Sequence, residues 1–342
     1  MKLGNRIIGS NEKPLIIAEI GINHNGNLEV AKNLVQLAAK SGCECIKHQT
    51  HIVEEEMSEE AKDIYPPNDP RSIWEIMETC SLSLEEEAEL KNYTEKLGLI
   101  YISTPFSAKA ADFLNDINVP GFKIGSGECD NLPLIKHVAN FKKPIILSTG
   151  MNTIESVKRS YRTILKINPD ICLLECTNLY PSPPENVSLK GIIELQKNFP
   201  NTLIGFSDHS IGPWMSLASI ALGAVIVERH FTDSRYSKGP DIINSMDPAE
   251  LRFLIDRSQE IFIARTNDKK RTIEEESVYR FARASVVAIK DISTGDKLTR
   301  ENIWVKRPGN GEIPGYDYEG CLGKIAKAKI KRNTQIKLSD IE

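Results

Sequence analysis

The sequence predicts an α/β fold, a closed parallel (β/α)8 TIM barrel, and three observations support this prediction. Short apolar runs alternate with stretches of helical periodicity, the runs are apolar on both faces, and there are eight of them. Strands buried on both faces are typical of parallel sheets covered by helices. The runs span residues 14–21, 43–50, 99–106, 121–127, 144–150, 171–178, 202–209 and 224–231. The clearest helical stretches are 28–39, 84–97, 154–167 and 248–264.

The chain is longer than one barrel, so a second domain is expected. It has 342 residues, whereas a barrel of this kind needs roughly 250. Residues 265–276 are polar and charge-rich, and from about residue 281 short β runs alternate with turn residues, which is typical of a small, mostly β domain. We therefore predict a barrel over residues 1–266, a linker over 267–280 and a second domain over 281–342.

Composition and charge exclude several classes of protein. The chain is 40% apolar and 26% charged, as ordinary globular proteins are. No apolar run approaches the ~20 residues of a membrane span, and the first residues lack a signal-peptide core. The seven scattered cysteines show no paired metal spacing, so buried free thiols are expected. We expect a cytoplasmic protein that does not bind membranes.

The two predicted domains differ in charge. Residues 281–342 carry 12 Lys and Arg against 8 Asp and Glu, a balance of +4. The whole chain carries −4, so residues 1–280 carry −8. A basic domain could dock on an acidic barrel, its own or that of a second copy, or it could be solvated independently.

Polar residues of the kinds used in catalysis end most of the apolar runs. Barrel enzymes carry their active sites at the C-terminal ends of the strands, so these side chains are expected to meet at one rim. They are Glu19, Lys47, Gln49, Thr104, Lys123, Ser126, Ser148, Asn178, Ser207, His209 and His230.

His209 and His230 end the last two runs, which are expected to be neighbouring strands about 5 Å apart. Two imidazoles at that spacing can share a divalent ion and leave positions open for water and a substrate oxygen. Such an ion suits Lewis-acid activation of an aldehyde. We expect Mn²⁺, with Mg²⁺ or Co²⁺ as alternatives. Each histidine could instead be an ordinary strand-end residue that is hydrogen-bonded to the backbone.

Lys47 and Lys123 lie in the second and fourth runs and are expected to point from those strands. A buried lysine is costly without an anion, so each implies a bound anion or a nearby carboxylate. Together with neutral donors they would form a cradle for phosphate and carboxylate groups. Lys123 could instead be a Schiff-base nucleophile, although a serine-rich cradle argues against this. The neutral donors, which could instead cap loop backbone, are Ser126, Ser148, Asn178 and Ser207.

Two carboxylates lie near the same predicted rim. Glu19 interrupts an otherwise apolar run, and Glu128 follows the fourth run. A carboxylate that faces an activated water can act as a general base or proton shuttle, and Glu19 is the preferred candidate. Glu19 could also form an ion pair with Lys47 or Lys123, and both roles can hold together.

Motifs along nearly the whole chain closely resemble the sialic acid synthase family. The segment 47–51 (KHQTH) favours the bacterial N-acetylneuraminate synthases over the legionaminate and pseudaminate synthases. The matching motifs are 20–26 (IGINHNG), 47–57 (KHQTHIVEEEM), 123–128 (KIGSGE), 147–152 (LSTGMN), 176–181 (CTNLYP), 205–209 (GFSDH), 228–233 (ERHFTD) and 304–310 (WVKRPGN).

The resemblance implies a metal-bearing barrel, a C-terminal antifreeze-like (SAF) domain and a homodimer in which this domain reaches the partner subunit's active site. It implies that phosphoenolpyruvate, N-acetylmannosamine and water give N-acetylneuraminate and phosphate by C–O cleavage. The alternative product is legionaminate, made from 2,4-diacetamido-2,4,6-trideoxymannose. The residues that match the family's sugar contacts are Asn68, Phe106, Tyr180, Asp241 and, in the second domain, Arg307.

Two further points concern the second domain. Arg283 stands where relatives carry an apolar residue, so the sequence leaves the local docking of the small domain open but not the chemistry. A binding protein whose basic domain contacts nucleic acid or ice is a rival of another class. It is disfavoured because the domain lacks interleaved aromatic residues and has no basic run beyond Lys331-Arg332. We therefore expect no nucleic-acid partner.

Overall fold

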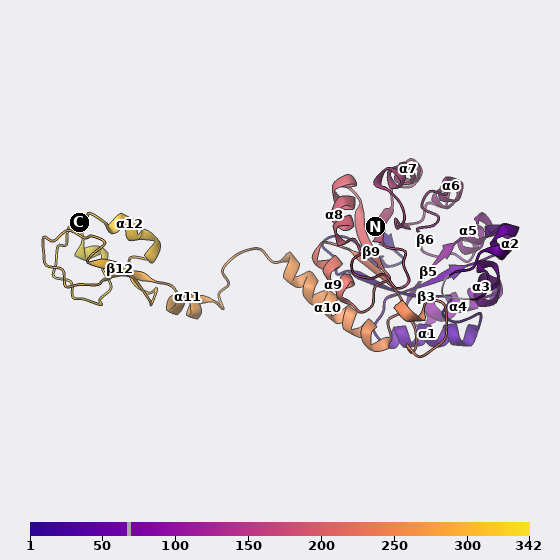
Figure 1. Cartoon of the computed structure of the whole chain (residues 1–342), viewed down its shortest axis with the longest axis horizontal. Coiled ribbons are helices and arrows are strands. Elements are labelled where there is room, and N and C mark those ends of the chain that lie inside the picture. Colours follow the sequence, from indigo (N-terminus) through magenta and orange to yellow (C-terminus); the bar gives the residue numbers. More distant parts are fainter. Residues whose placement is uncertain (67–69) are drawn as a thin grey trace. The chain divides into compact units, whose positions relative to one another are not determined.

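Within the residues that the structure describes, 1–66 and 70–342, eight parallel strands close into a barrel (Figure 1). The computed structural model divides the chain into two units, Met1–Asn267 and Asp268–Glu342, and the barrel lies in the first. The predicted TIM barrel is confirmed. Its strands are β3 (Leu15–Gly21), β4 (Cys45–Thr50), β5 (Ile100–Pro105), β6 (Phe122–Ile124), β7 (Ile145–Ser148), β8 (Ile171–Cys176), β9 (Leu203–Asp208) and β10 (Ile226–His230).

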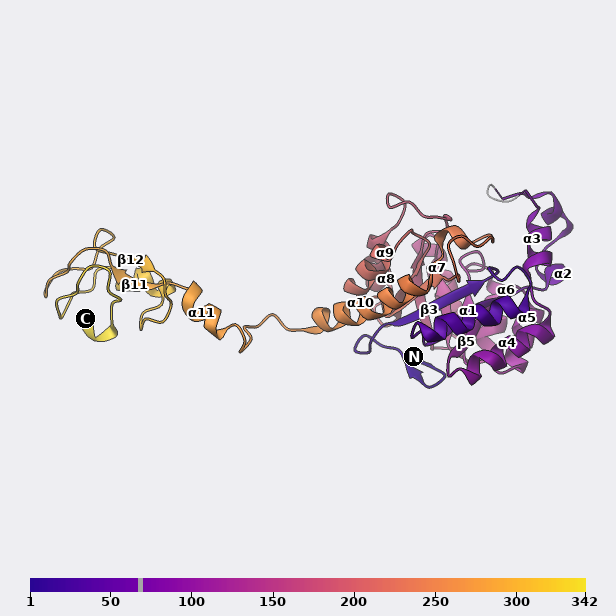
Figure 2. The ribbon, with the colours of Figure 1, turned by 90° about the horizontal axis from the view of Figure 1, so that it is seen from below.

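Helices surround the strands of the first unit (Figures 1 and 2). The four helices predicted from periodicity end within two residues of their predicted bounds. Local capping explains several starts, as at α4, where Ser83 and Glu86 form a capping box. The helices are α1 (Leu28–Lys40), α2 (Val53–Glu56), α3 (Ile73–Cys80), α4 (Leu84–Lys96), α5 (Ala108–Asp116), α6 (Leu132–Asn140), α7 (Ile154–Leu165), α8 (Leu189–Asn198), α9 (Trp214–Ala221) and α10 (Pro248–Thr266), with the short 3-10 turns η1 (Glu59–Asp63) and η2 (Ile242–Asn244).

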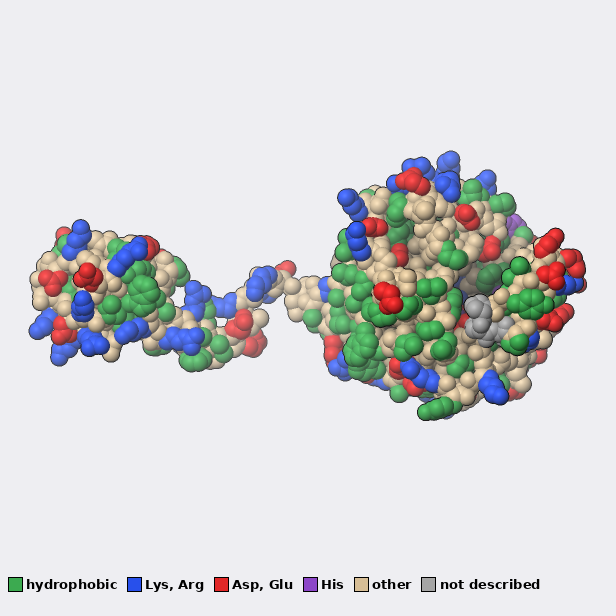
Figure 3. All heavy atoms as spheres, viewed as in Figure 1, with side chains coloured by type: hydrophobic (Ala, Val, Ile, Leu, Met, Phe, Trp, Pro, Cys, Tyr) green, Lys and Arg blue, Asp and Glu red, His purple; other side chains and the backbone are tan. Residues whose placement is uncertain are grey.

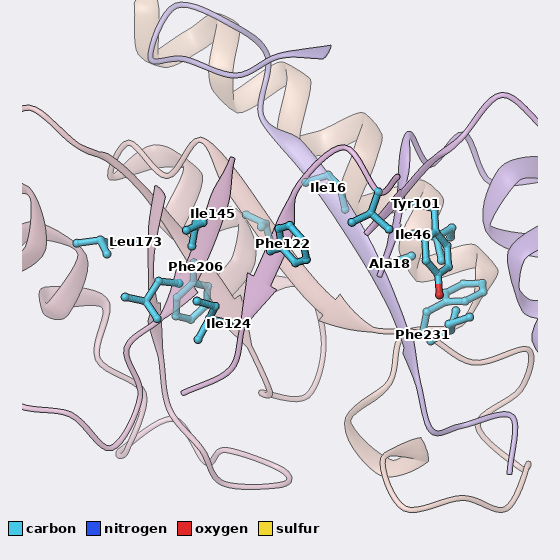
Figure 4. Close-up of a cluster of buried hydrophobic side chains, with 14 of the residues drawn as sticks. Ile16, Ala18, Ile46, Tyr101, Phe122, Ile124, Ile145, Leu173, Phe206 and Phe231 are labelled. Carbon is cyan, nitrogen blue, oxygen red and sulfur yellow. The ribbon is translucent and has the colours of Figure 1, made fainter. Parts of the chain in front are cut away.

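The core has two layers because side chains alternate between the two faces of a strand. Outward residues such as Ile16, Ala18 and Phe122 pack beneath the helices (Figure 4). Inward residues such as Ile17 and Cys45 fill the barrel interior. A hairpin of β1 (Lys2–Leu3) and β2 (Arg6–Ile7) belongs to this inner layer through Leu3. The positions that follow along the inward face are polar, and they form the site described below.

The second unit has its own core, formed by residues such as Val286, Leu298 and Ile336. Strands β11 (Ser285–Ala288) and β12 (Ile303–Lys306) pair antiparallel, and isolated bridges join the remaining loops. The unit also contains α11 (Glu276–Ala282), η3 (Gly315–Asp317), α12 (Tyr318–Cys321) and η4 (Leu338–Asp340). Helix α11 occupies the last part of the predicted linker. Figure 3 shows basic side chains spread over the visible face of this unit and acidic ones gathered on the first unit at α2.

All seven cysteines lie in the described residues, and all are buried free thiols, as predicted. None of the helices described in residues 1–66 and 70–342 is long and apolar enough to cross a membrane.

Candidate active site

A cavity of about 140 Å³ opens where the inward side chains of the barrel change from apolar to polar. Most of the residues predicted from strand ends line it, so the structure brings them together as expected. Its polar and aromatic lining residues are Lys47, Gln49, Thr104, Phe106, Lys123, Ser126, Ser148, Asn178, Tyr180, Ser207, His209, Glu228 and His230. Glu19 lies just behind this lining.

Lys47 is held between two carboxylates. Its ammonium group forms an ion pair with Glu19 and lies 4.0 Å from Oε1 of Glu228. It also donates a hydrogen bond to Oγ1 of Thr104 at 3.2 Å. The other oxygen of Glu19, Oε1, accepts a hydrogen bond from Gln49 Nε2 at 3.1 Å. The expected ion pair between Glu19 and a lysine is therefore present.

Lys123 shares the second of these carboxylates. Its Nζ lies 3.6 Å from Oε1 of Glu228, and the same oxygen accepts a hydrogen bond from Ser207 Oγ at 3.2 Å. Oε2 of Glu228 is buried and has no hydrogen-bond partner among the described residues. One carboxylate thus faces both lysines of the cavity.

Burial and pairing set the charges of this cluster. Burial raises the pKa of Glu19, and Lys47 only partly opposes it. Burial alone would lower the pKa of Lys47, but Glu19 and Glu228 raise it above its ordinary value. Burial lowers the pKa of Lys123, with Glu228 opposing. Although burial disfavours the carboxylate of Glu228, the two lysines and His209 hold its pKa below the usual range. Lys47 and Glu228 are therefore charged at neutral pH.

The neutral donors of the cavity differ in what they already bind. Ser126 Oγ accepts a hydrogen bond from the Gly150 backbone N–H at 3.0 Å, which is the loop-capping role left open above. Ser148 Oγ is buried and has no hydrogen-bond partner among the described residues. A buried hydroxyl without a partner is costly, so Ser148 is the neutral donor best placed to bind a ligand.

His209 and His230 face each other across adjacent strands β9 and β10, with ring centroids 5.4 Å apart. The contact of His209 Nδ1 with the Thr177 carbonyl at 2.8 Å requires Nδ1 to donate, so Nε2 carries a lone pair. His230 Nδ1 lies 3.6 Å from Oδ2 of Asp241. Burial lowers the pKa of both imidazoles. His230 Nδ1 has no hydrogen-bond partner among the described residues, so only the His209 ring is oriented by an oxygen. Neutral imidazoles are the form that binds divalent ions, so the donor chemistry of this pair fits a metal.

A second cavity, of about 500 Å³, adjoins the first and shares Gln49, Phe106, Asn178, Tyr180 and His230 with it. Burial and Glu19 raise the pKa of Asp241 to about 7. Asp241, one of the residues expected to contact the sugar, lines this cavity. The other described lining residues are largely apolar: Ile22, Pro66, Ile73, Ile76, Met77, Leu179 and Pro240.

Three predicted site residues are not part of this assembly. Glu128 lies in the turn between β6 and α6, where it accepts a hydrogen bond from Asn131 Nδ2 at 2.5 Å and lines a separate cavity with Glu55. Its predicted catalytic role finds no support in this position, because the chain has left the barrel before reaching it. Asn68 lies outside the described residues. Arg307 belongs to the second unit.

The residue that sequence reasoning missed is Glu228. It stands two positions before His230, so it points to the same face of β10. A charged residue at an inward position of an apolar run is the signal that identified Glu19, and it was present here too. Cys176 also lines the cavity, and it stands two positions before Asn178, as Glu228 stands two positions before His230.

Comparison with known proteins identifies the two parts of the chain. A model of the NeuB family matches residues 34–270, and a model of the SAF domain matches residues 283–342. N,N'-diacetyllegionaminic acid synthase from Campylobacter jejuni is 37% identical over 334 residues, which cover 95% of this chain and 99% of that protein. Human N-acetylneuraminate-9-phosphate synthase is 34% identical over 328 residues, which cover 94% and 90% of the two chains.

A solved structure gives the same result. The N-acetylneuraminic acid synthetase of Leptospira borgpetersenii, determined in complex with citrate, superposes with a TM-score of 0.74 at 28% identity. The match covers 81% of this chain and 94% of that one.

Proposed function

This chain belongs to the NeuB family of sialic acid-type synthases and carries a C-terminal SAF domain, and we propose that it condenses phosphoenolpyruvate with an N-acylated hexose and releases phosphate. The observation that carries this proposal is the central cavity. It combines two lysines, an unpartnered serine hydroxyl and two neutral imidazoles at the carboxyl ends of the strands. Phosphoenolpyruvate, with its phosphate and carboxylate, matches the cations and donors.

Each group has a role in the proposed reaction. Lys47, Lys123 and Ser148 bind the phosphate and carboxylate of phosphoenolpyruvate and stabilise the charge that develops as phosphate leaves. His209 and His230 would hold a divalent ion, Mn²⁺ first, which supplies Lewis-acid activation of the sugar aldehyde.

The bonds change in the following order. C3 of phosphoenolpyruvate attacks the open-chain aldehyde carbon, and the developing cation at C2 takes water. Glu19, which burial keeps basic enough to accept a proton, takes one from this water through the cluster it forms with Lys47 and Gln49. The alkoxide left on the former aldehyde carbon takes up a proton and becomes a hydroxyl group. The tetrahedral intermediate then loses phosphate by cleavage of the bond between C2 and the phosphate oxygen, while its C2 hydroxyl gives its proton to the leaving phosphate and becomes the ketone.

The acyl sugar belongs in the second cavity, and we propose N-acetylmannosamine as the substrate. A specific observation favours a second candidate, 2,4-diacetamido-2,4,6-trideoxymannose. No lysine or arginine is among the described residues that line this cavity, and Ile73, Ile76 and Met77 form an apolar wall. Such a wall suits acetyl and methyl groups and does not suit a phosphate on the sugar.

Separate assays with the two sugars distinguish the candidates. The purified chain is incubated with phosphoenolpyruvate, Mn²⁺ and one sugar, while phosphate release and product mass are measured. The proposed function requires phosphate release that depends on one of the sugars. If neither sugar causes phosphate release, the proposal is contradicted. A tenfold preference in kcat/KM for one sugar, about 1.4 kcal/mol, would identify the substrate.

We further propose a cytoplasmic homodimer in which the SAF domain of one chain supplies Arg307 to the sugar site of the other. An arginine guanidinium donates strong hydrogen bonds to a carbonyl such as the acetamido oxygen. The balance of +4 in residues 281–342 against −8 in residues 1–280 supports such docking.

A further inference from the structure

We propose that Ser285 and Gln335 are positioning residues that hold the Arg307 loop, residues 307–311, in the conformation that presents Arg307 to the acylated sugar. The inference rests on the proposed function, in which Arg307 contacts that sugar. Arg307 itself is exposed, and its guanidinium carbon lies 5.8 Å from the centre of the Phe281 ring. The loop behind it is tied to three separate segments of the second unit.

Ser285 ties the loop to strand β11. This serine is completely buried, and in the ladder it is opposite Lys306, the last residue of β12 before Arg307. Its hydroxyl donates to the Pro308 carbonyl at 2.9 Å and accepts from the Gly311 backbone N–H at 2.9 Å. One buried hydroxyl therefore satisfies backbone groups on both sides of the loop.

Gln335 ties the loop to the C-terminal segment. Its Nε2 group donates to the Pro308 carbonyl at 3.0 Å and to Oδ1 of Asn310 at 2.9 Å. The backbone at Gln335 is itself bridged to Val287 of β11. The bridge thus fixes the backbone that carries the amide, and the amide contacts the Pro308 carbonyl that Ser285 also contacts.

The third anchor is helix α11. The Gly309 backbone N–H donates to the carbonyl of Arg280 at 2.8 Å. A Cβ atom at Gly309 would lie 2.6 Å from Cβ of Arg283, and one at Gly311 would lie 2.8 Å from Cβ of Ser285. Both distances are shorter than real contacts, so the close approach of the loop to its supports requires glycine at both positions.

The arrangement has a physical consequence for binding. Ordering a flexible loop when a ligand binds costs affinity, because each residue loses conformational freedom. In the folded domain the loop is already ordered by the Ser285 hydroxyl, the Gln335 amide and the close contacts at the two glycines, so this entropy is lost on folding and not on binding. Arg307 then needs to order only its own side chain on the sugar, and the contribution of Ser285 and Gln335 to sugar binding passes through Arg307.

The test compares Gln335→Met with Arg307→Ala in the full-length chain. Gln335→Met keeps the length of the side chain and removes both hydrogen bonds to the loop. We expect the KM for the sugar used in the assay to rise about 3- to 10-fold, as the loss of one or two hydrogen bonds predicts, with the KM for phosphoenolpyruvate changed less than about twofold. Ser285→Ala should act in the same direction.

Thr334→Val is the matched control, because it removes the neighbouring hydrogen bond to the Lys331 carbonyl and leaves the loop untouched. The decisive measurement is the double variant. On an Arg307→Ala background, Gln335→Met should add less than about twofold to the sugar KM, because the two residues act in series.

Two results would overturn the inference and one would overturn its premise. The inference fails if Gln335→Met leaves the sugar KM unchanged while Arg307→Ala raises it, or if the two effects multiply in the double variant. If Arg307→Ala itself leaves the sugar KM unchanged while the enzyme turns over, the proposed role of Arg307 is wrong.

Discussion

The two units of this chain place their functional cations in opposite ways. In the barrel, Lys47 and Lys123 are buried, and carboxylates contact their ammonium groups directly. In the second unit, Arg307 is exposed, and the support acts on the backbone of its loop. A buried charge needs a partner of opposite sign, whereas an exposed charge needs only a defined position. The predictions below test the two arrangements in order of expected effect.

The largest effect is expected at the two histidines. His209→Ala or His230→Ala should abolish turnover and leave the unfolding transition close to that of the parent, since both lie at the rim. A chelator should abolish turnover reversibly, and readdition of Mn²⁺ should restore it. Activity assays and circular dichroism check this prediction. Full activity after dialysis against excess chelator would contradict the metal role.

The next largest effect concerns the buried cations. Lys123→Ala should lower kcat/KM for phosphoenolpyruvate by about 30- to 1,000-fold, or roughly 2–4 kcal/mol, because it removes a charged contact. Lys136→Ala, an exposed lysine of α6, is the control and should change nothing. Borohydride treatment with substrate should leave Lys123 unmodified by mass spectrometry. A covalent adduct on Lys123 would establish the Schiff-base alternative instead.

The exposed cation should give a smaller and more selective effect. Arg307→Ala should raise the sugar KM about 10- to 100-fold, as expected for a hydrogen bond from a charged donor, with little change in phosphoenolpyruvate binding. Mixing this chain with a Lys123→Ala chain tests whether the SAF domain of one subunit supplies Arg307 to the active site of the other. Each heterodimer would contain one intact site, so up to about half of the parental activity should return per heterodimer. If no activity returns although subunit exchange is demonstrated, Arg307 does not act in the partner subunit's site.

The smallest effect sharpens the comparison with Glu175, a partly buried carboxylate that forms no ion pair with the described residues. Glu175 on β8 lies against Gly191 of α8, and burial together with Glu194 raises its pKa to about 7. The folded state therefore binds more protons than the unfolded state between pH 4.5 and 7, so the free energy of unfolding falls as pH rises through that window. Glu175→Gln should stabilise the chain at pH 8 by about 1–3 kcal/mol.

Urea unfolding at pH 4 and pH 8 checks this prediction. The difference in stability between the parent and the Glu175→Gln variant should be present at pH 8 and should shrink at pH 4, where the parent side chain is protonated in both states. An equal difference at both pH values would show that the substitution acts through packing and not through charge.

Local patterns were sufficient to predict the barrel and most of its site. Short runs that are apolar on both faces, with helical periodicity between them, identify the strands. In a parallel barrel every strand delivers its last inward side chain to the same rim. Lys47, Lys123, His209 and His230 follow from that rule without any knowledge of contacts. The family resemblance, carried by long motifs, agrees with the NeuB and SAF matches.

Two details of the structure did not follow from the sequence. Glu128 is the last residue of the motif 123–128, and the turn after β6 decides that its side chain meets Asn131 and not the cavity. The stretch predicted as a linker ends in helix α11. This helix has a local i,i+4 ion pair between Glu276 and Arg280. It also accepts a hydrogen bond at the Arg280 carbonyl from the backbone N–H of Gly309, which is distant in the chain. In the first place the geometry of a local turn decides the outcome, and in the second a contact between segments decides it.

The sequence by itself determined the fold class, the rim at which polar residues gather and the family to which the chain belongs. These follow from periodicity and from ordered motifs, which are properties of neighbouring residues. Only the tertiary structure decided that Glu228 faces both lysines, that Ser148 lacks a partner, and that Ser285 and Gln335 converge on Pro308. Charge pairing and hydrogen bonding depend on distances of a few ångströms between residues far apart in the chain, and folding sets those distances.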